Sequence, residues 1–177
     1  MFMKYIPLLL LIVFSQRIFA QAPVVTLGGI GDFKVGMTKA QVEKLTGSPL
    51  KLVKLLKKDD WDRDTLDIIY KNVPYQIIMD KDYINEKSSG FIVYEIKSNG
   101  PTLKTKSGIG IGDDKLKIIS AYEGYVIYIL PGYEDDYETK SKTKSTVWLH
   151  GEDGKLIVFY LTNNKVTGFS VMFNEGC

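Results

Sequence analysis

The residues best suited to chemistry in this 177-residue chain form one acidic run, DDWDRDTLD. Asp60, Asp62 and Asp64 have the D-x-D-x-D spacing of a calcium-binding loop. Such a loop needs a glycine at its sixth position for a sharp turn, and a bidentate glutamate at its twelfth. Thr65 and Lys71 occupy those positions here. The run therefore predicts a solvated acidic turn and no metal site.

Two other candidates for chemistry also lack the partners that they would need. The stretch GIGIGDD looks like a phosphate-binding loop, but Asp113 stands where G-x-G-x-x-G requires its last glycine. Two adjacent aspartates would repel phosphate, so we expect a tight turn into a helix. His150 is the one histidine of the chain, and one histidine without other strong ligands does not make a zinc site. The sequence therefore predicts a non-enzyme with no cofactor and no metal.

Aromatic residues are the more informative group. Period-two alternation places Trp148 and His150 on one face of a strand, and Val147 and Leu149 on the other. A face rich in Trp, Tyr and Met suits protein recognition, although the same residue types also complete hydrophobic cores. The candidate partner-binding residues are Trp61 and Tyr137, at equivalent loop positions, and Tyr128, Trp148, Tyr160 and Met172, on one sheet face.

The sequence VGMTKAQVEKLTG predicts a short helix with a defined start and end. Thr38 is a good N-cap, and Gln41 three residues later completes a capping box. Gly47 can adopt the left-handed conformation that ends a helix, and Pro49 prevents its continuation. A helix of about nine residues is marginal alone, so it must pack on another element.

A second helix is predicted 76 residues later, in IGDDKLKIISAYEG, with Asp114 as its N-cap and Gly124 as its end. Runs rich in β-branched and aromatic residues follow both helices, separated by turn residues. We therefore expect an α+β fold of two tandem repeats, each a short helix region plus a four-stranded antiparallel sheet, with the helices on one sheet face. The predicted strands are LKLVKLL, TLDIIYK, PYQIIMD and GFIVYEIKS in the first repeat, and YVIYIL, STVWLHG, KLIVFYLT and KVTGFSVMF in the second.

The first helix motif resembles that of two related protein groups. The tandem arrangement resembles the β-lactamase inhibitory protein, in which two helix-plus-four-strand repeats form a saddle-shaped sheet. That resemblance implies a sheet face used for protein contacts in an exported setting, and the composition resembles secreted proteins of the Bacteroidetes type. The motif is also similar to the helix start of small outer-membrane-assembly proteins of the SmpA/OmlA kind, at Gly36, Met37, Thr38, Val42, Leu45 and Gly47. Those assembly proteins are lipoproteins and the inhibitor has internal disulfides. Cys177 is the one cysteine of this chain, so it has neither a cysteine to lipidate near the cleavage site nor an internal disulfide.

The first 20 residues have the pattern of a secretory signal peptide. Lys4 precedes a nine-residue apolar run, and Ala20 precedes a plausible cleavage site. The run is shorter than the roughly 20 residues that span a bilayer, which predicts a periplasmic or extracellular protein without stable membrane insertion. Removing this segment leaves 21 basic and 21 acidic residues, a balance that excludes general attraction to nucleic acid. The expected organisation is a signal peptide at 1–20, a first repeat at 21–104 and a second repeat at 105–177, the two repeats forming one compact unit.

These features together predict an exported, non-enzymatic binding module that recognises a protein partner through an open sheet face. A different class of function is the carriage of a small ligand or lipid in the cell envelope. A carrier would have a closed apolar cavity, whereas a protein binder would expose a broad aromatic patch. A hydrolase would instead need a buried polar cluster in a cleft, and the sequence gives no sign of one.

Overall fold

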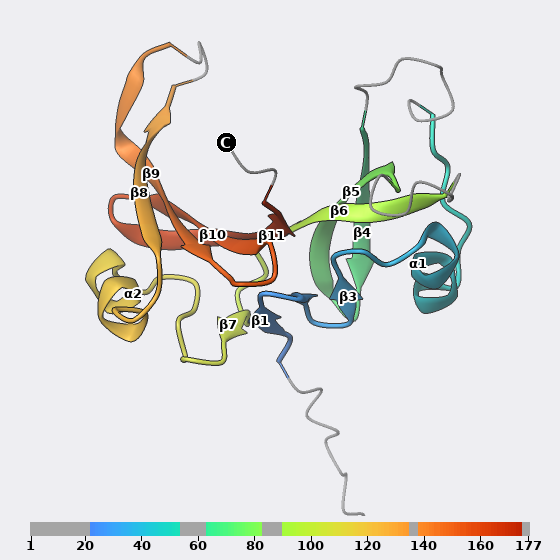
Figure 1. Ribbon diagram of the computed structural model, residues 1–177, viewed down its shortest axis with the longest axis horizontal. Coiled ribbons are helices and arrows are strands. Elements are labelled where there is room, and N and C mark those ends of the chain that lie inside the picture. Colours follow the sequence, from blue (N-terminus) through green and yellow to red (C-terminus); the bar gives the residue numbers. More distant parts are fainter. Residues whose placement is uncertain (1–21, 54–62, 83–89, 135–137, 175–177) are drawn as a thin grey trace, which may run out of the picture.

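The computed structural model describes residues 22–53, 63–82, 90–134 and 138–174. In these ranges the protein is mostly β, with a seven-stranded sheet, a four-stranded sheet and two short helices (Figure 1). The large sheet has the order β4-β5-β6-β11-β10-β9-β8, and all of its neighbouring strands are antiparallel. Its strands are β4 (Asp64–Tyr70), β5 (Val73–Lys81), β6 (Phe91–Ser98), β8 (Ile127–Tyr133), β9 (Lys140–His150), β10 (Lys155–Thr162) and β11 (Lys165–Phe173).

The small sheet connects the two parts of the chain. It has the order β3-β2-β1-β7, in which β1 and β7 form a parallel pair. Strand β7 lies in the connection between β6 and the second helix, so this pair ties the N-terminal segment to the middle of the chain. The strands are β1 (Val24–Thr26), β2 (Gly29–Ile30), β3 (Phe33–Lys34) and β7 (Lys104–Thr105).

The expected α+β fold of two helix-plus-four-strand repeats is wrong, because one continuous seven-stranded sheet dominates a mostly β structure. Three large-sheet strands follow the first helix and four follow the second. The predicted strand LKLVKLL accounts for the difference, since its residues 50–53 form no strand and the remainder lies outside the described residues. Side chains bind its backbone instead: the Leu50 amide donates to Glu43, and the Val53 amide donates to Asp64. These bonds replace the ladder that a strand would need.

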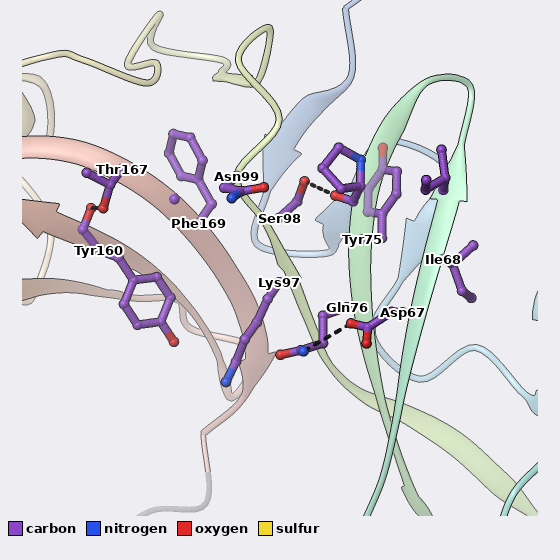
Figure 2. A pocket seen from close by; sticks show the side chains of 13 residues that line it. Asp67, Ile68, Tyr75, Gln76, Lys97, Ser98, Asn99, Tyr160, Thr167 and Phe169 are labelled. Atoms are coloured by element: carbon purple, nitrogen blue, oxygen red, sulfur yellow. Dashed lines mark hydrogen bonds between the residues drawn. The ribbon is translucent and has the colours of Figure 1, made fainter. Parts of the chain in front are cut away.

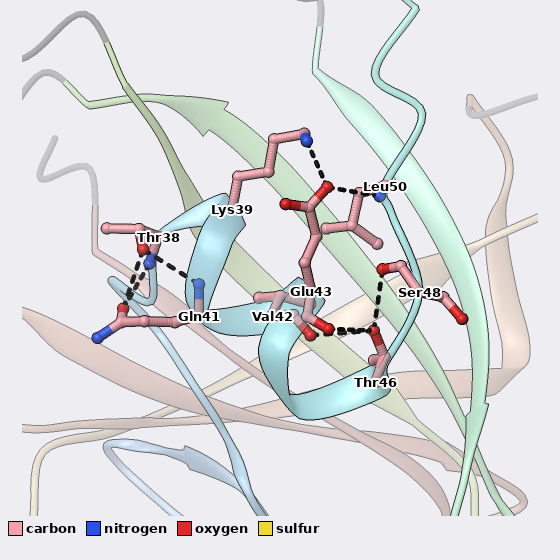
Figure 3. A network of polar contacts seen from close by, with 8 residues as sticks. All are labelled: Thr38, Lys39, Gln41, Val42, Glu43, Thr46, Ser48 and Leu50. Carbon is pink, nitrogen blue, oxygen red and sulfur yellow. Dashed lines mark hydrogen bonds and ion pairs between the residues drawn. The ribbon is translucent and has the colours of Figure 1, made fainter.

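Helix α1 (Lys39–Thr46) begins and ends as the sequence predicts (Figure 3). The Thr38 hydroxyl accepts a hydrogen bond from the Gln41 amide, and the Gln41 side chain accepts one from the Thr38 amide at 2.8 Å. This reciprocal pair is a capping box. Gly47 is left-handed, with φ 71°, and its N–H donates to the Glu43 carbonyl. The helix is therefore defined at both ends by local interactions.

Helix α2 (Lys115–Ala121) has the predicted start but a different end. The Asp114 carboxylate accepts from the Leu116 amide at 2.9 Å, which confirms the N-cap. The helix ends at Tyr122, with φ −129°, so the expected end at Gly124 is wrong. The Tyr122 ring is buried and lies 6.0 Å from the ring of Phe159. Packing of this side chain against the sheet therefore coincides with the end of the helix.

One hydrophobic core joins all of these elements. Both helices and the small sheet lie on the same side of the large sheet (Figure 1). Their buried side chains form one cluster with one face of the large sheet. No helix among the described residues has the length and apolar character needed to cross a bilayer. The covering side chains include Val25, Ile30, Phe33, Val42, Leu103 and Ile118.

Candidate functional site

The face of the large sheet opposite this core, here called the second face, carries a row of side chains that crosses all seven strands. Cross-strand pairing fixes the row, because residues directly opposite each other in neighbouring strands point to the same side. The row runs from one edge of the sheet to the other. In strand order it contains Asp67, Gln76, Lys97, Ser170, Val158, Trp148 and Tyr128.

The centre of the second face is buried and polar. Ser170 is fully buried, and its hydroxyl donates to the Glu95 carboxylate at 2.5 Å. The Lys97 ammonium lies 3.5 Å from the same carboxylate oxygen. Burial raises the pKa of Tyr160 to about 12, the Glu95 charge adds to this, and a hydrogen bond with Ser170 opposes it. Ser170, Glu95 and Lys97 therefore bind one another at the centre of the second face.

Four of the six candidate residues lie on the second face, as the period-two pattern predicts. Tyr128 is directly opposite Trp148, while Tyr160 and Met172 project from the two neighbouring strands. Tyr128 is 52% exposed, whereas the other three side chains are only partly exposed. Trp148 donates its indole N–H to the Thr146 hydroxyl at 3.0 Å. The accessible part of this set is therefore at the sheet edge and not at its centre.

The remaining predicted positions lie in loops, and most of them fall outside the described residues. Trp61 and Tyr137 do so, and so do Asp60 and Asp62 of the D-x-D-x-D spacing. Asp64, the third aspartate of that spacing, is buried and accepts a hydrogen bond from the Val53 amide. Among the described residues no group of three or more acidic, histidine or cysteine side chains could hold a metal ion.

The glycine-rich stretch forms the tight turn that the sequence predicts. The Asp113 carboxylate accepts from the Gly110 amide at 2.7 Å and pairs with the Lys117 ammonium at 2.9 Å. Both contacts hold the pKa of Asp113 below its usual value, and the contact with Lys117 has the larger effect. The Gly110 amide, which a phosphate would need as a donor, is therefore already bonded to Asp113.

Strand β8 exposes an unusual amount of apolar surface. Six of the nine large apolar residues that the described chain exposes lie between positions 125 and 133, and no charged residue occurs in that segment. Exposed apolar patches of this kind mark sites of interaction on soluble proteins. We call this segment the β8 edge, and its exposed residues are Tyr125, Val126, Tyr128, Ile129, Leu130 and Tyr133.

Some backbone N–H and C=O groups of the β8 edge point away from the sheet. The His150 amide donates to the Val126 carbonyl at 3.1 Å, and the register continues regularly from there to Pro131. Because backbone groups alternate in direction along an antiparallel strand, those of Ile127 and Ile129 point away from β9. Pro131 has the same outward orientation and has no N–H to offer, as is usual for proline in an edge strand.

A pocket of about 590 Å³ lies where β6 ends (Figure 2). Strand β6 pairs with β11 only from Glu95 to Ser98, and beyond this point the chain turns away. The Ser98 hydroxyl donates to the Pro74 carbonyl at 2.5 Å, and Pro74 has no N–H to extend the ladder. The sequence patterns did not predict this site. Its signals are Pro74 and Gly168, each isolated within a strand pattern.

Comparison of this chain with protein-family models, curated proteins and solved structures gives no match. The resemblance to the β-lactamase inhibitory protein and to the SmpA/OmlA group therefore stays a prediction.

Proposed function

We propose that this protein is an exported, non-enzymatic recognition module that binds an extended segment of another protein by strand addition at the β8 edge. The observation that carries the proposal is the uncharged, apolar β8 segment with outward backbone groups at Ile127 and Ile129. An added strand would take its main-chain hydrogen bonds from these groups, and alternate side chains would supply specificity.

The chemistry of the β8 edge defines the partner. Tyr128 and Leu130 point to the second face, while Ile129 points to the opposite side, so an added strand meets apolar surface on both of its faces. A segment with apolar or β-branched residues and no charge in its central part fits this surface.

The alternative function, carriage of a lipid, does not suit the pocket at the end of β6. That pocket is open, and polar side chains from three strands line it, namely Asp67, Gln76 and Lys97. A lipid tail in such a site would displace water from these groups and offer them no hydrogen bond in return.

The proposal is tested by capture of partners from the secreted and envelope proteins of the organism that makes this chain. Ile129 on β8 and Ile69 on β4 are both exposed, and they lie in the two outermost strands of the same sheet. Ile129→Lys places a charge in the β8 edge, and Ile69→Lys is the matched control.

We expect the wild-type protein and Ile69→Lys to capture the same protein through an extended segment, and Ile129→Lys to lose it. The proposal is wrong if the partner remains bound to Ile129→Lys, or if the β8 edge binds only a second copy of this chain. Circular dichroism of the two variants establishes that both retain the fold.

A further inference from the structure

The pocket at the end of β6 has the shape of a ligand site that is built into the sheet. Its volume, about 590 Å³, lies within the range of small-molecule sites. Gly168 forms part of the lining, directly opposite Tyr160 in the neighbouring strand. A β-carbon at Gly168 would lie 3.4 Å from the Ser98 carbonyl oxygen and 3.9 Å from the Tyr160 ring. The missing side chain thus leaves the space that a ligand would occupy.

A local irregularity in β11 contributes to this space. The register between β10 and β11 shifts after the Tyr160–Gly168 pair, so that Thr167 is an extra residue. Its hydroxyl donates to the Tyr160 carbonyl at 3.2 Å and lines the pocket. Bulges of this kind redirect side chains and are frequent beside functional sites.

Polar groups converge on the pocket from several strands, and their positions are fixed (Figure 2). The Gln76 amide donates to the Asp67 carboxylate at 3.2 Å, which leaves the Gln76 carbonyl oxygen as an acceptor. Lys97 is held by its ion pair with Glu95, and the Tyr160 side chain is half-buried beside Gly168. Side chains held in this way bind a ligand with little loss of conformational entropy.

The lining contains one carboxylate, Asp67, and one ammonium, Lys97, and each already has a polar partner in the protein. The Lys97 ammonium has the Glu95 carboxylate 3.5 Å away, and the Asp67 carboxylate accepts from Gln76. An anion would compete with Glu95 for Lys97, and a cation would meet Lys97 across the pocket. The lining therefore offers hydrogen-bond donors and acceptors without a net charge to select an ion.

We propose that this pocket binds a neutral saccharide. Sugar hydroxyls are both donors and acceptors, so they match the alternating carboxylate, amide and ammonium groups of Asp67, Gln76 and Lys97. The Tyr160 ring beside Gly168 supplies an aromatic surface for the apolar C–H groups of a sugar ring. This inference is independent of the β8 edge, which is a separate surface of the sheet.

NMR titration of the ¹⁵N-labelled chain tests this assignment. The probes are glucose, galactose, N-acetylglucosamine, cellobiose, lactose and chitobiose, with glutamate and inorganic phosphate as charged probes. We expect shifts at the amides of Gln76, Lys97 and Gly168 with at least one sugar, at a Kd on the order of 1 mM or tighter. Raising the salt concentration should change that affinity by less than about twofold, because no net charge attracts the ligand.

Two glycine variants decide whether the shifts come from the pocket. Gly168→Val fills the space with a side chain that suits a strand, and should weaken sugar binding at least tenfold. Gly124→Val is the control, since a β-carbon there would meet nothing within 4 Å. The proposal is overturned if the sugar-induced shifts remain in Gly168→Val. It is also overturned if no sugar shifts the pocket amides at a concentration on the order of 10 mM, or if only glutamate or phosphate binds. The backbone spectrum of Gly168→Val shows whether that variant is folded. Lys97→Met is a second variant, which removes the ammonium donor without filling the space, and it should also weaken sugar binding.

Discussion

The chain follows the same path through the two halves of the large sheet, but the outer strands of the two halves expose different kinds of side chain. In the first half the chain runs from the outer strand β4 inward to β6, and in the second half from the outer strand β8 inward to β11. The exposed residues of β4 include Thr65 and Asp67 beside Ile69, whereas β8 is uncharged throughout. The number of strands also differs, three against four.

The two outer strands therefore differ in how readily another chain could pair with them, although the path of the chain is the same. A charged residue in an edge strand limits pairing with other chains, and β4 carries one in the middle of its exposed residues. Strand β8 is protected only at the end of its regular register with β9, by Pro131 and by the irregular pairing that follows it. The same fold path thus ends in one protected edge and one edge suited to recognition.

The largest effect on the free energy of unfolding is expected when a phenylalanine is removed from the core beneath either half. Phe33 lies 4.8 Å from the Tyr75 ring in the first half, and Phe159 lies 5.5 Å from Phe169 in the second. Both phenylalanines are fully buried, so either substitution by alanine should lower the free energy of unfolding by about 3–5 kcal/mol. Denaturant unfolding should stay a single transition in both variants, because one core joins the halves. Two separate transitions would show that the halves are independent.

The second prediction concerns the protection of the β8 edge. Pro131→Val adds an outward N–H to the strand, so the variant should self-associate at concentrations where the wild-type protein is monodisperse. Pro131→Lys adds the same N–H together with a charge, and should remain as dispersed as the wild type. Sedimentation velocity measures both. Equal association by the two variants would mean that backbone donors at this position do not limit pairing.

The third prediction compares the two helix caps. Thr38→Ala should lower the free energy of unfolding by about 1 kcal/mol at any pH, because the lost hydroxyl does not titrate. The cap of α2 is the Asp114 carboxylate, whose pKa is lowered first by its bond from the Leu116 amide. A lowered folded-state pKa stabilises the protein above the unfolded value, and this contribution disappears as pH falls through the folded value.

Asp114→Ala should therefore destabilise the protein at pH 7 and have little effect at pH 2. Thermal unfolding of both variants at the two pH values measures this contrast. An Asp114→Ala effect that does not change with pH would show that the charge is not what caps α2.

The smallest effect near neutral pH is expected from one tyrosine in each half, because neither side chain titrates there. Burial raises the pKa of Tyr75 and the pKa of Tyr160 to about 12, from the model-compound value of 10.0. The folded protein then keeps these protons longer than the unfolded chain, so stability is complete below pH 10 and falls as pH rises through 12. Tyr75→Phe and Tyr160→Phe should each reduce this alkaline loss in denaturant titrations. A loss that neither variant changes would place its origin elsewhere.

The sequence predicts those parts of the fold that depend on neighbours in the chain. The cap at Thr38, the left-handed Gly47 and the cap at Asp114 are set within four residues, and all three are confirmed. The shared face of Tyr128 and Trp148 follows from period-two alternation once the register of β8 and β9 is known. The three helix features need no information about distant strands, whereas the shared face also needs the register of β8 against β9.

The parts that could not be predicted depend on distant contacts. LKLVKLL has the composition of a strand, but the Glu43 and Asp64 carboxylates bind its Leu50 and Val53 amides. The β1–β3 and β7 strands have only two or three residues each, too few for a periodic pattern. The pocket depends on where β6 stops pairing with β11, and pairing register is not visible in either strand alone.

Hydrogen exchange at single amides of β8, with and without the captured partner, tests the central claim most directly. In the free protein the Ile127 and Ile129 amides point outward and should exchange quickly, whereas the Tyr128 amide points to β9 and should exchange slowly. Strand addition predicts that partner binding slows exchange at Ile127 and Ile129 and leaves Tyr128 nearly unchanged. If both isoleucine amides exchange as quickly in the complex as in the free protein, the β8 edge is not the docking site.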